Sequence, residues 1–440
     1  MAFDNDELNK RRQRRAELRQ QRKAQQKKLT IGLIAAGVVL VLCAALILVL
    51  ALGNRSSSSE TQPPETTETP VTTEGATLSQ TQPSTEETLL STEPPASNVV
   101  RLAVAGDLVV TDKTVTAGVS GTGYDYSRVF MDVLPLLTDA DLTLMNFEGN
   151  FCGAPYGSQT VSAPEEMLDA LVRAGVDMLQ MANSCTINNG LLGLSETLDT
   201  IRSAGIDPIG AFSSPAEFRE TGGYTIREVN GIKIAFIAFT KGMDNLGLPS
   251  GSEDCVNLLY QDYDSTYQKV DTDRINKILR NAASEKPDIT IALLHWGSEY
   301  NDQISSTQKT ILNLMLDGGV DVVLGTHSHY VQQMIHDPVN NTFVAYSLGD
   351  FYSDAETAGS NYSVVLELEF TKDGATGVTT ITNYSYTPIF THTAISGHRV
   401  VRIHSAIEAY ENNNIDHISA ADYESMVYAL KRIEERIKGE

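Results

Sequence analysis

The sequence from residue 99 onward predicts an α/β fold, because short apolar runs alternate with amphipathic segments of helical length. The apolar runs, each as long as a strand, occupy residues 102–105, 142–145, 178–182, 234–239, 289–294, 320–324 and 343–347. The helical segments occupy residues 126–137, 165–174, 191–204 and about 306–316. Gly175, Gly205 and Gly318 close three of these segments, as helix C-caps do. Apolar strands that alternate with helices indicate a sheet covered on both faces.

The end of the chain, residues 396–440, predicts a helical extension of this domain. Ser419, followed three residues later by Asp422, resembles a capping box at the start of a helix. The apolar positions of this helix keep helical spacing and are Met426, Leu430, Ile433 and Ile437. We expect the helix to pack against the domain, and binding of a partner is the alternative.

The charge of the 440-residue chain, −23 in total, is divided unevenly. Residues 1–28 contain ten Lys and Arg against four Asp and Glu, whereas the remaining residues contain 23 against 52. A strongly acidic body repels polyanions, so nucleic acid is excluded as a partner of the unaided protein. The basic segment suits the cytoplasmic face of a membrane instead.

Residues 29–53 predict a transmembrane helix. They contain no charge over 25 residues and would span roughly 37 Å as a helix, enough to cross a hydrocarbon core of about 30 Å. A cleaved signal peptide is the alternative, since Ala51-Leu52-Gly53 is a weak cleavage-like end, but its apolar region is usually shorter. The sequence therefore predicts a single-pass protein of the cell membrane, with residues 1–28 cytoplasmic and the main domain extracellular.

Residues 54–98 predict a disordered stalk. They consist almost wholly of Ser, Thr, Glu, Gln and Pro, so they cannot bury enough apolar surface to offset the entropy of the chain. Such a segment suits lifting a domain off a membrane.

Polar side chains follow most of the predicted strands, at the point where each strand ends. They are Asp107, Asn146 and Glu148, Asn183 with Ser184 and Cys185, His295, the pair His327 and His329, and Asp350. Because ligands of α/β sheets bind beyond the carboxyl ends of the strands, we expect one shared polar site. Imidazole with carboxylate suits Zn, Mn or Fe, and two such ions could clamp a phosphoryl group. Neither a G-x-S-x-G motif nor a Walker loop is present.

These residues lie in ordered blocks that resemble the CapA family of poly-γ-glutamate capsule biosynthesis proteins. The blocks are Val104-Ala105-Gly106-Asp107, Asn146-Phe147-Glu148, Met181-Ala182-Asn183, Gly210-Ala211, His295-Trp296-Gly297-Ser298-Glu299-Tyr300, Gly325-Thr326-His327-Ser328-His329 and Tyr346-Ser347-Leu348-Gly349-Asp350-Phe351. The resemblance covers about residues 99–395. It implies a fold similar to the calcineurin-like metallophosphoesterases, a sandwich of two β-sheets flanked by helices.

The resemblance also implies roles for single residues. Divalent metal ions, two of Mn, Fe or Zn, are expected on Asp107, Glu148, Asn183, His295, His327 and His329, with Glu148 as the bridge. The residues expected to be catalytic are Asp107, His295 and Cys185. The residues expected to bind substrate are Asn146, Trp296, Glu299 and Asp350.

The chain departs from the family pattern after the third block. The family reads Ala-Asn-Asn-His, whereas this chain reads Ala182-Asn183-Ser184-Cys185, so an amide ligand and a general-acid histidine are both replaced. Loss of a positioned proton donor costs about 10²–10⁴-fold in rate. For Cys185 we rank a plain buried thiol first, and a thiolate ligand or a disulfide with Cys152 second. Asp350 stands where the family usually has asparagine.

Three functions follow as hypotheses. The leading one is a membrane-anchored protein for biosynthesis, export or surface retention of an anionic capsule polymer, poly-γ-glutamate, with a membrane synthase complex as a possible partner. The second is an extracytoplasmic metal-dependent phosphoesterase, and the third is a surface binding module without catalysis. An acidic body that handles a polyanion needs metal ions or basic residues to offset repulsion, and Lys241 and Arg274 are candidates.

Overall fold

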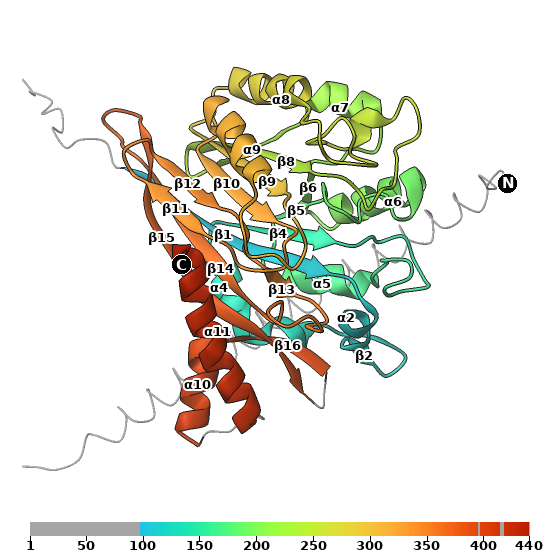
Figure 1. Ribbon diagram of the computed structural model, residues 1–440, viewed down its shortest axis with the longest axis vertical. Helices are drawn as coiled ribbons and strands as arrows, with labels where there is room; N and C mark the ends of the chain where they lie inside the picture. The colour runs from blue at the N-terminus through green and yellow to red at the C-terminus, as the bar shows by residue number, and fades with distance from the viewer. Residues whose placement is uncertain (1–96, 395–396, 414–417, 440) are drawn as a thin grey trace, which may run out of the picture. The chain divides into compact units, whose positions relative to one another are not determined.

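The computed structural model describes residues 97–394, 397–413 and 418–439. The predicted basic segment, the predicted transmembrane helix and nearly all of the predicted stalk lie outside the described residues. Within them, none of the helices combines the length and the hydrophobicity needed to cross a membrane. The predicted α/β class is confirmed for this part of the chain, which contains two large mixed sheets and surrounding helices (Figure 1).

The first sheet has the strand order β16-β15-β14-β1-β4-β5-β6, with β13 paired to β1 beside this path. Its strands are β1 (Asn98–Val109), β4 (Leu142–Glu148), β5 (Met178–Gln180), β6 (Asp207–Ile209), β13 (Asp350–Tyr352), β14 (Tyr362–Lys372), β15 (Thr379–Ala394) and β16 (Gly397–Arg402). The half from β1 to β6 is parallel, and the half from β14 to β16 is antiparallel. The carboxyl ends of β1, β4 and β5 therefore lie at one edge.

The second sheet has the strand order β11-β12-β10-β9-β8-β7. Its strands are β7 (Thr225–Val229), β8 (Ile232–Thr240), β9 (Ile289–His295), β10 (Val322–Thr326), β11 (Met334–Asp337) and β12 (Thr342–Ala345). The central strands β8, β9, β10 and β12 are parallel, and β7 and β11 add antiparallel edges. Strands β1 and β6 of the first sheet contact β8 of the second, so the two sheets pack on each other.

Helices surround the two sheets. They are α2 (Asp112–Thr116), α3 (Ser127–Phe130), α4 (Leu134–Thr138), α5 (Glu165–Arg173), α6 (Gly190–Ser203), α7 (Pro215–Thr221), α8 (Thr272–Ser284) and α9 (Ser306–Asp317). Helix α8 packs on β8, and α6 packs on β6. The predicted helix at 126–137 is divided, because a 3₁₀ turn, Met131–Val133, separates α3 from α4. A two-stranded hairpin, β2 (Val119–Ser120) and β3 (Gly123–Tyr124), lies outside both sheets.

The apolar composition of the central strands explains their position. Strands β4 and β9 are buried along their whole length, as is expected of parallel strands covered on both faces. Their last residues, Glu148 and His295, are buried as well. A carboxylate and an imidazole at the ends of otherwise apolar strands must find charged or hydrogen-bonding partners there, because burial without them is costly.

The C-terminal part of the chain continues the first sheet. The predicted division at residue 395 falls between β15 and β16, which pair as antiparallel neighbours, so the sheet runs across it. Helices α10 (Ile403–Glu411) and α11 (Ala420–Lys438) follow, and α10 packs on β15 and β16 whereas α11 packs on β14 and β15 (Figure 1). The predicted capping box of α11 is confirmed, with Ser419 and Asp422 each accepting from the other's backbone N–H. Packing of α11 on the domain is likewise confirmed.

Gly106 allows β1 and the segment before β13 to approach closely. A methyl group at this position would lie 1.8 Å from the carbonyl oxygen of Gly349. We expect Gly106→Ala to push the two segments apart and to lower the free energy of unfolding by about 3 kcal/mol or more. Gly123→Ala is the matched control, because nothing lies within 4 Å of its added methyl group. Chemical unfolding of the purified chain tests this, and equal stability of the two variants would contradict the close approach.

Candidate metal centre

The carboxyl ends of strands from both sheets bring charged side chains together. Asp107 lies near the end of β1, Glu148 at the end of β4 and His295 at the end of β9. The register pairs Asp107 with Asp350 across β1 and β13. His329 comes from the loop after β10. All five side chains are at least nine-tenths buried.

These residues form two groups that could each hold a metal ion. In the first group, Asp107, Glu148 and His295 offer one ligand atom each, all within 4.8 Å of one another. In the second group, Asp107, His329 and Asp350 do the same. Asp107 belongs to both groups, so it is the carboxylate placed to bridge two ions. The resemblance implied Glu148 in this role, and the structure puts Glu148 in one group only.

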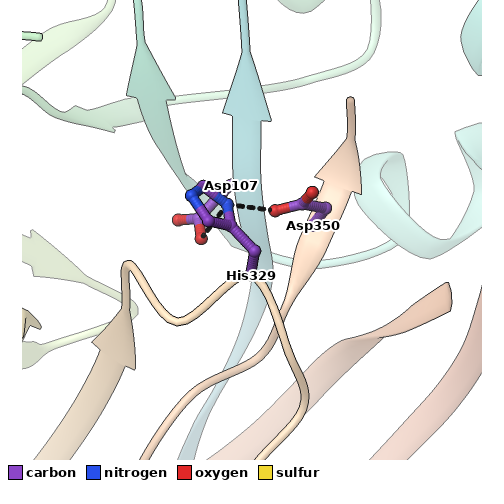
Figure 2. A group of neighbouring side chains, drawn as sticks. All are labelled: Asp107, His329 and Asp350. Carbon is purple, nitrogen blue, oxygen red and sulfur yellow. Dashed lines mark hydrogen bonds and ion pairs between the residues drawn. The ribbon is translucent and has the colours of Figure 1, made fainter. Parts of the chain in front are cut away.

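Figure 2 shows the second group, with dashed lines from His329 to Asp350 and to Asp107. Nδ1 of His329 lies 2.7 Å from Oδ1 of Asp350 and 3.8 Å from Oδ2 of Asp107. The ring of Tyr300 stacks on that of His329, with the ring centroids 5.1 Å apart. In the first group, Nδ1 of His295 lies 4.0 Å from Oε1 of Glu148.

His327 lies beside the first group. Its backbone N–H donates to Oδ2 of Asp107 at 3.2 Å, and its Nδ1 lies 3.1 Å from Nε2 of His295. Both His327 and His329 adopt left-handed backbone, with φ of 85° and 57°. This conformation costs about 1–3 kcal/mol in residues with a side chain and persists where the surroundings enforce it, often at functional sites.

Burial dominates the electrostatics of the carboxylates. It raises the pKa of Asp107 to about 7, although the nearby His329 opposes the rise. Burial and the charge of Asp107 raise the pKa of Glu148 well above its usual range. Each shift means that the ionised carboxylate lacks the solvation or the positive partners that would stabilise it.

The histidines divide into two kinds. Burial lowers the pKa of His295 and of His327 well below the usual range. The nearby His327 lowers the pKa of His295 further, and the nearby Lys241 lowers that of His327 further. Burial alone would also lower the pKa of His329, but its contact with Asp350 outweighs this and raises that pKa well above the usual range. Neutral imidazoles are the form that binds metals.

The donor set fits divalent metal ions. It combines three buried carboxylates with buried imidazole nitrogen. Oxygen and nitrogen donors of this kind suit Mn, Fe or Zn rather than Ca. Asp107, Glu148 and His295 would hold one ion, and Asp107, His329 and Asp350 the other.

Two amide side chains form hydrogen bonds that help to hold the carboxylates. Asn146, expected to bind substrate, is buried and donates Nδ2 to Oδ1 of Asp107 at 2.7 Å and to Oε1 of Glu148 at 3.2 Å. Asn183, expected to be a metal ligand, donates Nδ2 to Oδ1 of Asn146 and to the carbonyl oxygen of Phe147, and its Oδ1 accepts the N–H of Cys185. Both side chains therefore belong to the network that holds Asp107 and Glu148, and their expected roles toward substrate and metal stay predictions.

The other three residues expected to bind substrate lie in three different environments. Trp296 is fully buried, donates its indole N–H to the carbonyl oxygen of Tyr346 at 2.9 Å and stacks on the ring of Tyr346. It lies in the core in this structure, and its expected role in substrate binding stays a prediction. Asp350 belongs to the second ligand group rather than to a substrate surface. Glu299 is exposed and lines a cavity beside the centre.

The two residues that replace the family's amide ligand and histidine, Ser184 and Cys185, are both buried. The hydroxyl oxygen of Ser184 lies 2.8 Å from Nε2 of His295, so Ser184 helps to hold that ring, whose Nδ1 lies 3.0 Å from Oγ1 of Thr326. Cys185 is a free thiol, so no disulfide joins it to Cys152. It also belongs to neither ligand group. Burial, followed by the charge of Glu148, raises its pKa well above the usual range. The structure thus favours the plain buried thiol that we ranked first.

A polar cavity of about 490 Å³ opens beside His327. Lys241, which directly follows β8, lines it and places Nζ 3.3 Å from Nε2 of His327. Of the two basic residues considered as candidates, Lys241 therefore lies at the centre. Arg274 does not, because it pairs with Asp254 and packs over the ring of Phe218. The only sequence feature that pointed to a place for Lys241 near the centre was its position directly after the apolar run of β8.

The family and its relatives agree with the predicted resemblance. A model of the bacterial capsule synthesis protein family PGA_cap matches residues 101–355. The capsule biosynthesis protein CapA of Bacillus anthracis is 26% identical over 284 residues, which cover 62% of this chain and 64% of that protein. The PGA biosynthesis protein CapA of Bacillus subtilis (strain 168) is 24% identical over 271 residues, 60% of this chain and 66% of that protein. The match spans just under two thirds of the length of each relative.

Two solved structures are also similar to the chain. A phosphatase from Mycoplasma pneumoniae is 16% identical, with a TM-score of 0.41, and covers 67% of this chain and 95% of its own. The calcineurin-like phosphoesterase YfkN from Bacillus subtilis is 14% identical, with a TM-score of 0.38, and covers 77% of this chain and 98% of its own. The family is shown by the family model, which matches more than half of the residues: the chain belongs to the bacterial capsule synthesis protein family PGA_cap.

Proposed function

We propose that the protein is anchored in the cell membrane by residues 29–53 and acts outside the cytoplasm on an anionic capsule polymer, poly-γ-glutamate. Its role is in the biosynthesis, export or surface retention of that polymer, together with a membrane synthase complex. The observation that carries the proposal is the pair of ligand groups that share Asp107, in a chain of this family. The relatives named as capsule and PGA biosynthesis proteins support the same polymer.

The buried centre supports the handling of an anion by an otherwise acidic protein. When bound, divalent ions at the two groups would act as Lewis acids and offset negative charge on a ligand. Asn146 holds the carboxylates of Asp107 and Glu148, and Thr326 and Ser184 hold the ring of His295. These contacts fix the ligand atoms before a ligand arrives, and such preorganisation is what a binding or catalytic centre requires.

A second candidate is a metal-dependent phosphoesterase on the outer side of the membrane. Two adjoining groups with a shared carboxylate favour it, because two close ions suit displacement at phosphorus. Cys185 argues against efficient catalysis of this kind, since a thiol whose pKa lies far above neutrality is a poor proton donor. A binding module without catalysis is the third candidate, and it too would use the retained ligand groups.

One experiment separates these candidates. The purified full-length chain, loaded with Mn²⁺, is offered poly-γ-glutamate and, separately, bis(p-nitrophenyl) phosphate, and polymer binding, polymer length and nitrophenol release are measured. Metal-dependent binding or shortening of the polymer supports the proposal. Release of nitrophenol without any effect on the polymer supports the phosphoesterase. Neither signal in a protein that holds Mn²⁺ would overturn both, and Asp107→Asn serves as the variant without the shared ligand.

A further inference from the structure

The cavity beside the metal centre carries both signs of charge. Its lining residues are Lys241, Gly242, Asp244, Asn245, Tyr267, Ser298, Glu299 and His327. Its volume of about 490 Å³ lies within the range of small-molecule sites, about 300–1,000 Å³. Two residues of this lining contact the ligand groups, His327 through Asp107 and His295 and Lys241 through the backbone of His295, so the cavity adjoins the metal centre.

Lys241 is held rigidly at the inner wall. Its backbone N–H donates to the carbonyl oxygen of His295 at 2.8 Å, and this bond holds the backbone of Lys241 in place just after β8. Its ammonium group donates to the carbonyl oxygen of Gly297 at 3.0 Å and lies over the ring of Tyr267, 4.7 Å from the centroid. An ammonium group has three donors, and the carbonyl oxygen of Gly297 and Nε2 of His327 lie within reach of two of them, so a group in the cavity can accept the third.

Two carboxylates lie at the open side of the same cavity. Asp244 and Asn245 form a turn with left-handed backbone, with φ of 49° and 61°, that follows Lys241 closely. Glu299 lies in the loop after β9. Both acidic side chains are exposed, whereas Lys241 is half-buried. The cavity thus presents a positive group inside and negative groups at its mouth.

We propose, resting on the proposed function, that this cavity recognises the amino end of a γ-linked glutamate chain. Only the residue at that end carries an ammonium group and a carboxylate on the same carbon. Interior residues carry a carboxylate alone, and the residue at the other end carries two carboxylates. Lys241 pairs with the α-carboxylate of the terminal residue, and Asp244 and Glu299 pair with its ammonium group.

The charge pattern also selects against other parts of the polymer. An interior segment would place several carboxylates near Asp244 and Glu299, and this repulsion has no compensating contact. A phosphate ester would meet the same two carboxylates with a larger negative charge. The amino end is the one part of this polymer that complements both sides of the cavity.

The test compares two short probes on the Mn²⁺-loaded, full-length chain by calorimetry. They are γ-linked triglutamate with a free amino end and the same peptide with that end acetylated. We expect the free amino end to bind about tenfold more tightly, since acetylation removes one partly exposed ionic contact to two carboxylates. The double variant Asp244→Asn with Glu299→Gln should remove this preference. Lys241→Met should weaken both probes, whereas Lys309→Met, which removes an exposed lysine of α9, should change neither.

The outcomes separate this inference from the proposed function. Equal affinity for the two probes overturns recognition of the amino end and leaves a polymer-binding protein. A preference that survives the double variant also overturns it, because the ammonium group would then be read elsewhere. No binding of either probe or of the long polymer by a chain that holds Mn²⁺ overturns the proposed function itself.

Discussion

Replacing Asp107 by asparagine is expected to remove both metal ions from the protein. Asp107 is the one residue common to the two ligand groups, so its loss takes a charged ligand from each. His295→Ala and Asp350→Ala each change a single group and are expected to remove one ion. The geometry thus predicts two ions in the wild type, none in Asp107→Asn, and one each in His295→Ala and Asp350→Ala.

Elemental analysis of the full-length chain, reconstituted with Mn²⁺ or Zn²⁺ and freed of excess metal, measures these stoichiometries. Asp199→Asn is the matched control, because Asp199 is an exposed aspartate of α6 outside both groups. Thermal unfolding of each metal-free variant shows whether it folds. Asp107 is fully buried, and burial raises the pKa of its carboxyl group, so removal of its charge also removes a cost of folding.

The resemblance implies a different bridge, and the same experiment decides between the two. If Glu148 bridges the ions, Glu148→Gln removes both and Asp107→Asn leaves one. If Asp107 bridges them, Glu148→Gln removes only the ion shared with His295. A folded Asp107→Asn variant that retains one ion would therefore contradict the arrangement described above.

Much of the centre was predictable because its signals are local. Strand β4 is apolar and ends at Glu148, and β9 is apolar and ends at His295, so each strand shows both its own burial and the side chain that it delivers. The short spacing of His327 and His329 gave a similarly local signal. The rule that strand ends carry ligands then placed these residues together without knowledge of the loops.

The role of Asp350 depends on a contact between distant parts of the chain. Strand β13 pairs with β1 in parallel, and this pairing sets Asp350 opposite Asp107. The strand end before Asp350 placed it at the shared polar site, but no periodicity near it reports Asp107 as its partner, so its place in a ligand group was not predicted. The strands from β14 to β16 were missed in the same way, because their antiparallel pairing to β1 and to one another is set by tertiary contacts.

The direction of a side chain was the other information that the sequence lacked. Trp296 directly follows His295, but successive residues near a strand end point to opposite faces, and its ring enters the core. Asn146 and Asn183 lie at the centre as expected, yet their amide groups are used by neighbouring carboxylates and carbonyl oxygens. Hydrogen-bond partners of this kind depend on positions that only the folded chain defines.

The affinity of the centre for metal is expected to rise steeply with pH between about 6 and 8. Without metal, burial raises the pKa of Asp107 to about 7 and that of Glu148 well above its usual range. The pKa of His329 is raised as well, because the effect of the nearby Asp350 exceeds the opposite effect of burial. A group with a raised pKa keeps its proton to a higher pH, and a metal ion that binds below that pKa must displace the proton. Each proton displaced makes the affinity rise by about tenfold per pH unit.

Calorimetric titration of Mn²⁺ at pH 7 in two buffers of different ionisation enthalpy counts these protons. His295 and His327 should contribute none, because burial lowers the pKa of each and leaves both neutral at this pH. Glu148→Gln should reduce the count by about one, since glutamine has no proton to release. Equal heats in the two buffers would mean that no protons are released, and hence that the carboxylates are ionised before the metal binds. The positive charge of His329, which lies between contacts to Asp350 and Asp107, would then stabilise more of the buried negative charge than the raised carboxylate pKa values imply.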